Sequence, residues 1–220
     1  MSIRKVTFIP NEYYHIYNRG NSKQKIFLDK KDYQRFVDLL YAVNSQEGFN
    51  FSDSIKGISV YEQVKNPRLV SIGAYCLMPN HFHILITPLL EEGLTKFMQK
   101  LSTAYVMYFN GKYNRTGALF ESKFKAEHVN NDVHLKYLFS YIHLNPVKLI
   151  QKDWKEVGLK QKQKSITYLK SYKYSSFIDY LGENRPENII VSKSSFPNYF
   201  PNKKDFIEEI MTWINYDNTL

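Results

Sequence analysis

Residues 69–87 read LVSIGAYCLMPNHFHILIT, and this stretch decides the fold. It contains two apolar runs, Leu69–Leu77 and His81–Thr87, separated by Met78-Pro79-Asn80. Short apolar runs bounded by turn-forming residues are typical of strands, and the brief connection between them favours a hairpin. We therefore expect a hairpin made of two central strands.

Patterns on both sides of this hairpin predict further elements. Upstream, Tyr13–Asn18 predicts a strand, and Asp29 is expected to cap a helix that runs to about Asn44 with one apolar face. Downstream, the periodicity predicts a helix over roughly Leu94–Asn110 and a strand near the end of Ala118–Val129. Strands and helices therefore alternate through the first two-thirds of the chain.

A further helix should follow the last strand. We expect Asp132 to cap it, and Pro146 to end it at Asn145, because a residue before proline disfavours helical dihedral angles. The order of strand, helix, strand, strand, helix, strand and extra helix predicts an α+β fold. This is the ferredoxin-like, split βαβ arrangement, with an antiparallel sheet and two helices on one face.

The sequence also indicates how the chain is divided. We expect one main domain over residues 1–182, with an irregular insertion at about 48–68 that could include a short strand. Residues 183–220 are expected to form a C-terminal extension whose last part, Asp205–Asn215, is an amphipathic helix. Residues 148–173, between the expected last helix and this extension, are rich in lysine.

The composition favours a nucleic-acid partner. The chain has 30 Lys and Arg against 21 Asp and Glu, for a net charge of +9, and 16% of its residues are aromatic. Excess positive charge attracts polyanions, and flat side chains stack on unpaired bases. The single cysteine, Cys76, favours a reducing compartment, and no apolar segment reaches the roughly 18 residues of a membrane span. We expect a cytoplasmic protein with no membrane partner.

The strand His81–Thr87 carries a pair of histidines with a shared direction. Because successive strand residues point to opposite faces, His81 and His83 share one face while Phe82 and Ile84 take the other. Their Cα atoms would be about 7 Å apart, close enough for two imidazoles to bind one cation. A pair of exposed or hydrogen-bonded histidines would give the same sequence pattern, so the pair alone leaves both readings open.

The expected last helix offers a second set of reactive groups. Tyr141 and Asn145 are four residues apart, so both side chains project from one side of the helix. An amide oxygen can complete a metal shell, and a phenol can attack a phosphorus made electrophilic by the metal. Such an attack would leave a covalent phosphotyrosine and a free hydroxyl, which permits strands to be rejoined. Tyr137 lies one turn earlier and is an alternative candidate for the nucleophile. A purely structural role for these residues, in packing or capping the helix, is also compatible with the sequence.

Three motifs carry a resemblance to a known family. YCLMPNHFHILI (75–86), GALFESKFKAEHV (117–129) and YIHLNPVK (141–148) resemble the REP-associated tyrosine transposases and the related HUH transposases of bacterial insertion sequences. YKYSSFIDYLG (172–182) resembles the family's closing motif, so the likeness covers roughly residues 8–182. Insertion-sequence members often have Gln where this chain has Asn145, which favours the REP-associated branch.

The resemblance implies a specific activity. It implies a ferredoxin-like fold, a metal site at His81, His83 and Asn145, and Tyr141 as the nucleophile that forms a 5′-phosphotyrosine. The implied substrate is single-stranded DNA with hairpins, such as a repetitive extragenic palindrome or a transposon end. The ligand types alone would admit zinc, nickel, manganese or magnesium. The resemblance favours Mg²⁺ or Mn²⁺.

Basic residues that flank these motifs are expected to contact the DNA phosphates. They are Arg19, Lys112, Arg115, Lys123, Lys125 and Lys148. Two other functions fit the same fold: a non-catalytic module that binds hairpin DNA or RNA, and a hydrolytic nuclease that uses water as its nucleophile. Monomer and homodimer are both compatible with the sequence.

Overall fold

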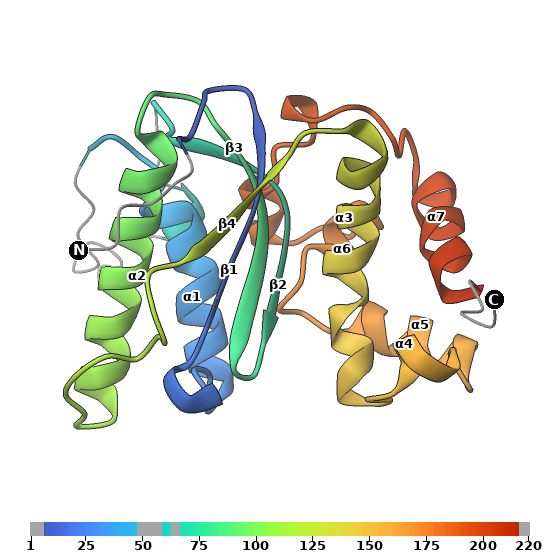
Figure 1. Ribbon diagram of the computed structural model, residues 1–220, viewed down its shortest axis with the longest axis horizontal. Helices are drawn as coiled ribbons and strands as arrows, with labels where there is room; N and C mark the ends of the chain where they lie inside the picture. Colours follow the sequence, from blue (N-terminus) through green and yellow to red (C-terminus); the bar gives the residue numbers. More distant parts are fainter. Residues whose placement is uncertain (1–6, 48–58, 63–66, 216–220) are drawn as a thin grey trace.

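The computed structural model describes residues 7–47, 59–62 and 67–215. Its centre is a four-stranded antiparallel sheet in the order β2-β3-β1-β4 (Figure 1). β3 pairs antiparallel with both β1 and β2, so β1 and β2 run parallel with β3 inserted between them. This is the predicted split βαβ arrangement. The strands are β1 (Tyr13–Arg19), β2 (Val70–Met78), β3 (His81–Pro88) and β4 (Lys125–Val129).

Helices cover both faces of the sheet (Figure 1). One face is covered by α1 (Lys30–Ala42) and α2 (Gly93–Lys112), as predicted. The other face is covered by α3 (Asp132–Leu144) and by the chain that follows it. The helices of that later part are α4 (Trp154–Val157), α5 (Lys162–Ser171), α6 (Phe177–Tyr180) and α7 (Lys203–Asn215). Short 3₁₀ helices are η1 (Asn21–Lys23), η3 (Val60–Glu62), η4 (Asn145–Leu149), η5 (Pro186–Ile190) and η6 (Lys193–Ser195).

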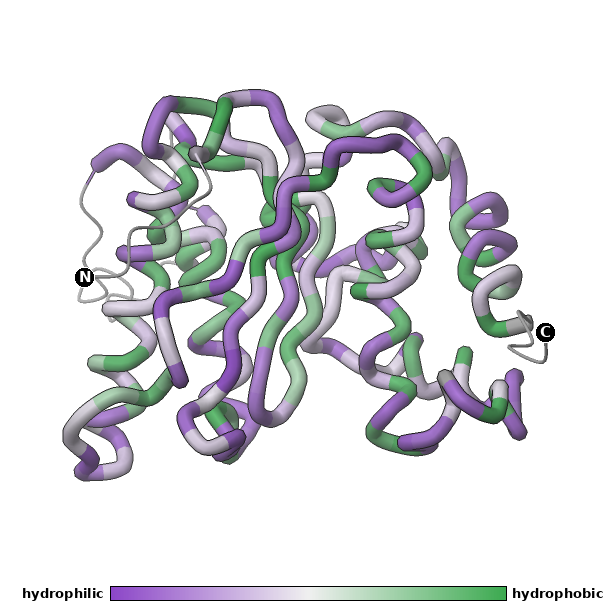
Figure 2. Tube along the Cα trace, in the orientation of Figure 1, coloured by the Kyte–Doolittle hydropathy of each residue, from purple (hydrophilic) through white to green (hydrophobic). Residues whose placement is uncertain are grey.

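Strand alternation separates the apolar residues into two cores. Phe82, Ile84 and Ile86 of β3 pack against α1 and α2, while Leu85 packs toward α3. Burying one such side chain stabilises the fold by about 1.5–3 kcal/mol. Figure 2 shows hydrophobic residues along the central strands and mainly hydrophilic ones along β4. The sheet is therefore a middle layer with a core on each face.

The predicted hairpin and helices are found with small shifts in their ends. Pro79 and Asn80 form the turn between β2 and β3. Asp29 caps α1 through a reciprocal capping box with Asp32, as its sequence position predicted. The predicted cap of α3 was wrong by one residue, because Asn131 is the extended residue whose side chain accepts from the His134 amide at 2.7 Å.

Pro146 does not end the helical path. The α-helix stops at Leu144, and the chain tightens into η4, where Pro146 stands at the beginning and needs no amide hydrogen. The lysine-rich stretch, for which the sequence analysis names no element, contains α4 and α5. Only Ser165, Ile166 and Leu169 of α5 are buried, so its apolar face is too narrow to stand out in the sequence.

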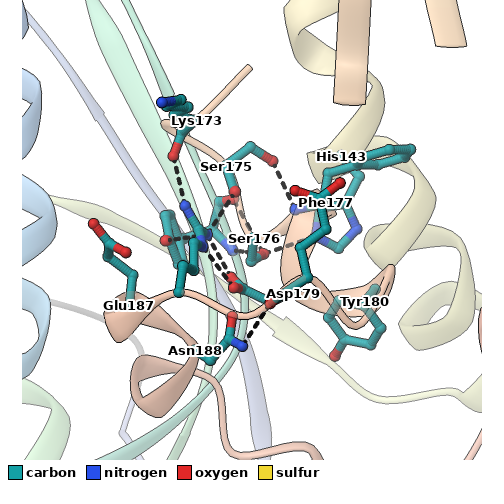
Figure 3. A network of polar contacts seen from close by, with 12 residues as sticks. His143, Lys173, Ser175, Ser176, Phe177, Asp179, Tyr180, Glu187 and Asn188 are labelled. Carbon is teal, nitrogen blue, oxygen red and sulfur yellow. Dashed lines mark hydrogen bonds and ion pairs between the residues drawn. The ribbon is translucent and has the colours of Figure 1, made fainter. Parts of the chain in front are cut away.

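The chain after Gly182 packs on the outer edge of the same sheet. The Ser192 amide donates to the Ile72 carbonyl at 2.9 Å, and the predicted terminal helix is present as α7. Figure 3 shows Ser175, Ser176 and Asp179 in the polar network that joins this region to β2.

The insertion predicted at 48–68 lies largely outside the described residues. Where the structure describes it, Val60–Glu62 form η3. No described helix combines the length and apolar character required to traverse a bilayer.

Candidate active site

Two histidines from neighbouring strands meet on the face of the sheet that is turned toward α3. The Nδ1 atom of His83 on β3 lies 2.9 Å from the Nε2 atom of His15 on β1, and both side chains are buried. His81 is half-buried at the start of β3, with its Nδ1 atom 2.7 Å from the Asn80 side-chain oxygen. The rings of His81 and His83 are nearly perpendicular, with centroids 5.1 Å apart. Strand alternation therefore places the predicted pair on one face, as expected.

Tyr141 lies beside this histidine group. Its helix α3 packs against β2 and β3, and its ring stands edge-on to His83 at 5.5 Å and to His15 at 5.8 Å between centroids. Burial, reinforced by Tyr137 and Glu127, raises the pKa of the Tyr141 phenol, so the group is protonated at neutral pH. The structure thus brings the predicted nucleophile next to the predicted metal-binding histidines.

Tyr137 occupies a different neighbourhood on the same helix. Its ring lies 5.9 Å from that of Tyr141 and 4.6 Å from that of Trp213 on α7. Its contacts are therefore with Tyr141 and the terminal helix, one turn before the residue that meets the histidines. This placement favours Tyr141 over Tyr137 as the reactive phenol.

Asn145 follows α3 at the point where the helix tightens into η4. Its Nδ2 atom donates to the Tyr141 carbonyl at 2.8 Å, and only 2% of its surface is exposed. Its Oδ1 atom is buried and has no hydrogen-bond partner among the described residues. Buried polar atoms are normally satisfied, so this amide oxygen has an unused capacity to bind a ligand. η4 packs against β2, the strand beside the two histidines.

Burial keeps two histidines of the site, His81 and His15, neutral. Burial lowers the pKa of His81 to about 4, with further lowering by Lys148 and Arg19. Burial also lowers the pKa of His15 to about 4, against the opposing effect of Glu127. A neutral imidazole has one nitrogen lone pair free of a proton, which is the form that binds metal.

The donor set fits a small divalent cation with open positions. No cluster of three His, Cys, Asp or Glu suited to a metal is found in the described part of the chain. The predicted set is instead two imidazoles and one amide oxygen, from His81, His83 and Asn145. Nitrogen and oxygen donors of this kind suit Mg²⁺ or Mn²⁺ when further oxygens come from a phosphate.

The sequence did not identify the residues that support His83 from the adjacent strands. His15 and Tyr17 of β1 and Glu127 of β4 lie on the same face, and Tyr17 donates to Glu127 Oε1 at 2.9 Å. Their alternation was visible in the sequence, but their partners depend on strand order and register. The next residue of β4, His128, lies on the opposite face beside Tyr14, with ring centroids 5.2 Å apart.

Three of the six predicted DNA-binding residues lie near the histidines. Arg19 is opposite His81 in the β1–β3 register, and its guanidinium is 3.0 Å from Glu121 Oε2. Lys125 Nζ is 6.0 Å from the centre of the Tyr17 ring. Lys148 in η4 is close enough to lower the pKa of His81. Three basic side chains thus lie near the site, and two of them, Arg19 and Lys125, are paired with Glu121.

The remaining three lie elsewhere. Lys112, at the end of α2, is bound by Asp29 at 2.8 Å and by the fully buried Asp32 at 2.6 Å. Arg115 stacks over Phe109, with its guanidinium carbon 5.4 Å from the ring centre. Lys123 lines a cavity of about 780 Å³ beside α2. These three residues therefore lie apart from the basic residues near the histidines.

Comparisons with known proteins concern the family and the fold of the chain. Residues 49–145 match the family model described as IS200-like transposase. Among solved structures, the chain is similar to a REP-associated tyrosine transposase bound to a REP hairpin, with 17% sequence identity and a TM-score of 0.53. The alignment covers 85% of this chain and 90% of the other, and it shows a shared fold. A search among curated proteins finds no match.

Proposed function

We propose that this chain is a metal-dependent DNA transposase that uses Tyr141 to cleave and rejoin single-stranded, hairpin-containing DNA. The match of residues 49–145 to the IS200-like transposase family model supports this proposal. One observation carries the proposal: the Tyr141 ring lies 5.5 Å from that of His83, whose neighbour on the same face is His81. A hydrolytic nuclease or a non-catalytic binding module has no need of a phenol at this position.

The proposed reaction exchanges one phosphodiester for another. The Tyr141 Oη atom bonds to the phosphorus, the bond from phosphorus to O3′ breaks, and a 5′-phosphotyrosine and a free 3′-hydroxyl result. The phenolic proton passes to solvent, and the leaving O3′ takes one up. A second 3′-hydroxyl can then displace the tyrosine, which rejoins strands without nucleotide hydrolysis.

A divalent cation, Mg²⁺ or Mn²⁺, would be held by His81, His83 and Asn145. When bound, such a cation neutralises phosphate oxygens and makes the phosphorus more electrophilic. The unpaired Oδ1 atom of Asn145 and the neutral imidazole of His81 support this assignment. Tyr141 stays protonated at neutral pH until the phosphate is in place, because burial raises its pKa.

The DNA partner follows from charge and from the family. Arg19, Lys125 and Lys148 lie near the histidines and would contact the backbone phosphates. The similar solved structure contains a REP hairpin, which supports a hairpin substrate for this chain as well. Cys76 is buried and unpaired, in keeping with a cytoplasmic setting.

Replacing Tyr141 with phenylalanine tests the proposal directly. Purified protein is incubated with end-labelled single-stranded hairpin DNA and Mn²⁺, and covalent adducts are separated on a denaturing gel. We expect Tyr141→Phe to lose the adduct entirely and to bind the same DNA within about threefold of wild type, because only the attacking oxygen is removed. Tyr137→Phe is the matched control and should keep the adduct.

Each alternative function gives a different result in this assay. A hydrolytic nuclease would cleave the DNA with no adduct, and a binding module would neither cleave it nor form one. An adduct that persists in Tyr141→Phe and disappears in Tyr137→Phe would move the reaction to Tyr137.

A further inference from the structure

A chain of three side chains leads from the surface of the sheet to His83. Glu127 Oε2 on β4 lies 3.7 Å from His15 Nδ1, and His15 Nε2 lies 2.9 Å from His83 Nδ1. Glu127 is directly opposite His15 in the β1–β4 register, so the backbone ladder fixes the pair. The carboxylate is itself held by the Tyr17 hydroxyl at 2.9 Å from Oε1. Three adjacent strands contribute one residue each to this row.

We propose that His15 is a positioning residue that, oriented by Glu127, holds His83 in the tautomer whose Nε2 lone pair can bind a metal. This inference rests on the proposed function, in which His83 is a metal ligand. It assigns a role to two residues outside the predicted site, and neither of them contacts the metal or the substrate.

The direction of the hydrogen bond between His15 and His83 follows from the charge of Glu127. Its carboxylate lies 3.7 Å from His15 Nδ1, and this negative charge favours the neutral form of His15 that carries its proton on Nδ1. That form leaves His15 Nε2 as an acceptor, and His83 must then donate from Nδ1. His83 therefore has no proton on Nε2, and that nitrogen carries the lone pair.

The reverse arrangement would block metal binding. If His15 Nε2 donated its proton, His83 Nδ1 would accept and Nε2 would carry the proton. Metal-binding histidines commonly donate their second nitrogen to a fixed acceptor, which sets both the tautomer and the ring orientation. Here the acceptor is the imidazole of His15, and the carboxylate of Glu127 lies on the far side of that imidazole.

The surroundings of His15 support a polar role over packing. Its side chain is buried on a face whose neighbouring positions include Leu85 and Val129. An apolar residue would bury more favourably there, because an imidazole without partners costs free energy in such a place. The partners of His15 are the ring of His83 and the carboxylate of Glu127, and both are held by strands.

The tautomer can be measured in the metal-free protein. Protein labelled with ¹⁵N-histidine is examined by long-range ¹H–¹⁵N correlation, and His83→Ala identifies the His83 signals. We expect wild-type His83 to be protonated at Nδ1 and unprotonated at Nε2. A wild-type spectrum with the His83 proton on Nε2 would overturn the proposal without any variant having to fold.

Two pairs of variants test how His15 and Glu127 contribute to metal binding. His15→Phe fills the site but removes the acceptor, whereas the side-chain oxygen of His15→Gln can replace it. Mn²⁺ affinity, measured by electron paramagnetic resonance, should fall about 10- to 100-fold in His15→Phe and recover in His15→Gln. Glu127→Ala should weaken Mn²⁺ binding less. Its matched control is Glu12→Ala, which removes a similarly exposed carboxylate 2.9 Å from His128 on the other face.

The outcomes separate this inference from the proposed function. If wild type formed no covalent adduct, or did not bind Mn²⁺, the proposed function would be contradicted. The His83 tautomer would still decide whether His15 orients His83. An unchanged tautomer and Mn²⁺ affinity in a folded His15→Phe protein would overturn the role of His15 even if wild type forms the adduct.

Discussion

The carboxamide of Asn145 uses only half of its hydrogen-bonding capacity. Its nitrogen is bound to the Tyr141 carbonyl, while its buried oxygen has no partner in the described structure. A buried acceptor without a partner costs about 1–3 kcal/mol. A fold retains such a cost where a ligand later removes it, which is the expectation for a metal-binding oxygen. Asn145 thus combines a structural hydrogen bond through its nitrogen with an oxygen that is available to the proposed cation.

Asn145→Leu separates the two roles of this residue. Leucine has a similar size and removes the unpaired oxygen together with the bond to Tyr141. The free energy of unfolding should therefore change by less than about 1.5 kcal/mol, whereas Mn²⁺ affinity should fall at least about tenfold. Urea denaturation and a Mn²⁺ titration give the two values.

Asn188→Leu is a matched control for this change. The Asn188 nitrogen also donates to a backbone carbonyl, that of Glu183 at 2.7 Å, and its buried oxygen is likewise unpaired. Because Asn188 lies in η5 and outside the proposed site, its variant should bind Mn²⁺ as wild type does. Equal losses of affinity in both variants would contradict the assignment of Asn145.

At the scale of single elements, local patterns predicted much of the site. The alternation of β3 placed His81 and His83 on one face, and helical spacing placed Tyr141 and Asn145 together. The cap of α3 was wrong because Asn131 and Asp132 can both cap, and only the backbone shows which residue is extended. His15 and its neighbours were not predicted, since strand register is a property of the whole sheet.

The cap of the helix that carries Tyr141 can be tested separately. Asn131→Ala removes the acceptor for the His134 amide and should lower the free energy of unfolding by about 1 kcal/mol. Asn131→Asp keeps an acceptor at the same place and should remain within about 0.5 kcal/mol of wild type. Urea denaturation of the three proteins measures both differences. Equal stability of Asn131→Ala and wild type would show that the cap does not support α3.

At the scale of the whole molecule, the later part of the chain is fixed to the sheet by a buried ion pair. Arg185 donates to Asp179 at 2.6 Å and to the Tyr75 hydroxyl of β2 at 2.9 Å. It also donates to the carbonyls of Lys173 and Ser175, so several segments meet around one guanidinium (Figure 3). Burial raises the pKa of Asp179, and Arg185 opposes that rise.

Removing Arg185 should be costly because it leaves a buried carboxylate without its partner. We expect Arg185→Leu to lower the free energy of unfolding by about 3–5 kcal/mol at neutral pH. The deficit should shrink as the pH falls toward 4, since Asp179 with a raised folded pKa then takes up a proton in the native state. The double variant Arg185→Leu/Asp179→Leu should regain most of the loss. A double variant as unstable as Arg185→Leu would show that the cost is not electrostatic.

The net charge of +9 matters to function only where it faces the DNA. Lys148 is next to the proposed site, whereas Lys96 lies on α2, behind the sheet, and pairs with Glu92 at 3.4 Å. Each lysine that contacts a phosphate of single-stranded DNA releases a counterion and adds about 0.7 to the slope of log affinity against log salt concentration. The two lysines should therefore differ in this slope.

Salt titrations of hairpin DNA binding measure that difference, and the Tyr141→Phe protein is the background because it should bind without cleaving. Lys148→Ala should reduce the steepness of the slope by about 0.7, and Lys96→Ala should leave it unchanged. The loss in affinity for Lys148→Ala should then be largest at low salt and shrink as salt is added, because fewer counterions are released on binding. Identical slopes for the two variants would place the DNA on another surface, and a reduced slope for Lys96→Ala alone would place it along α2.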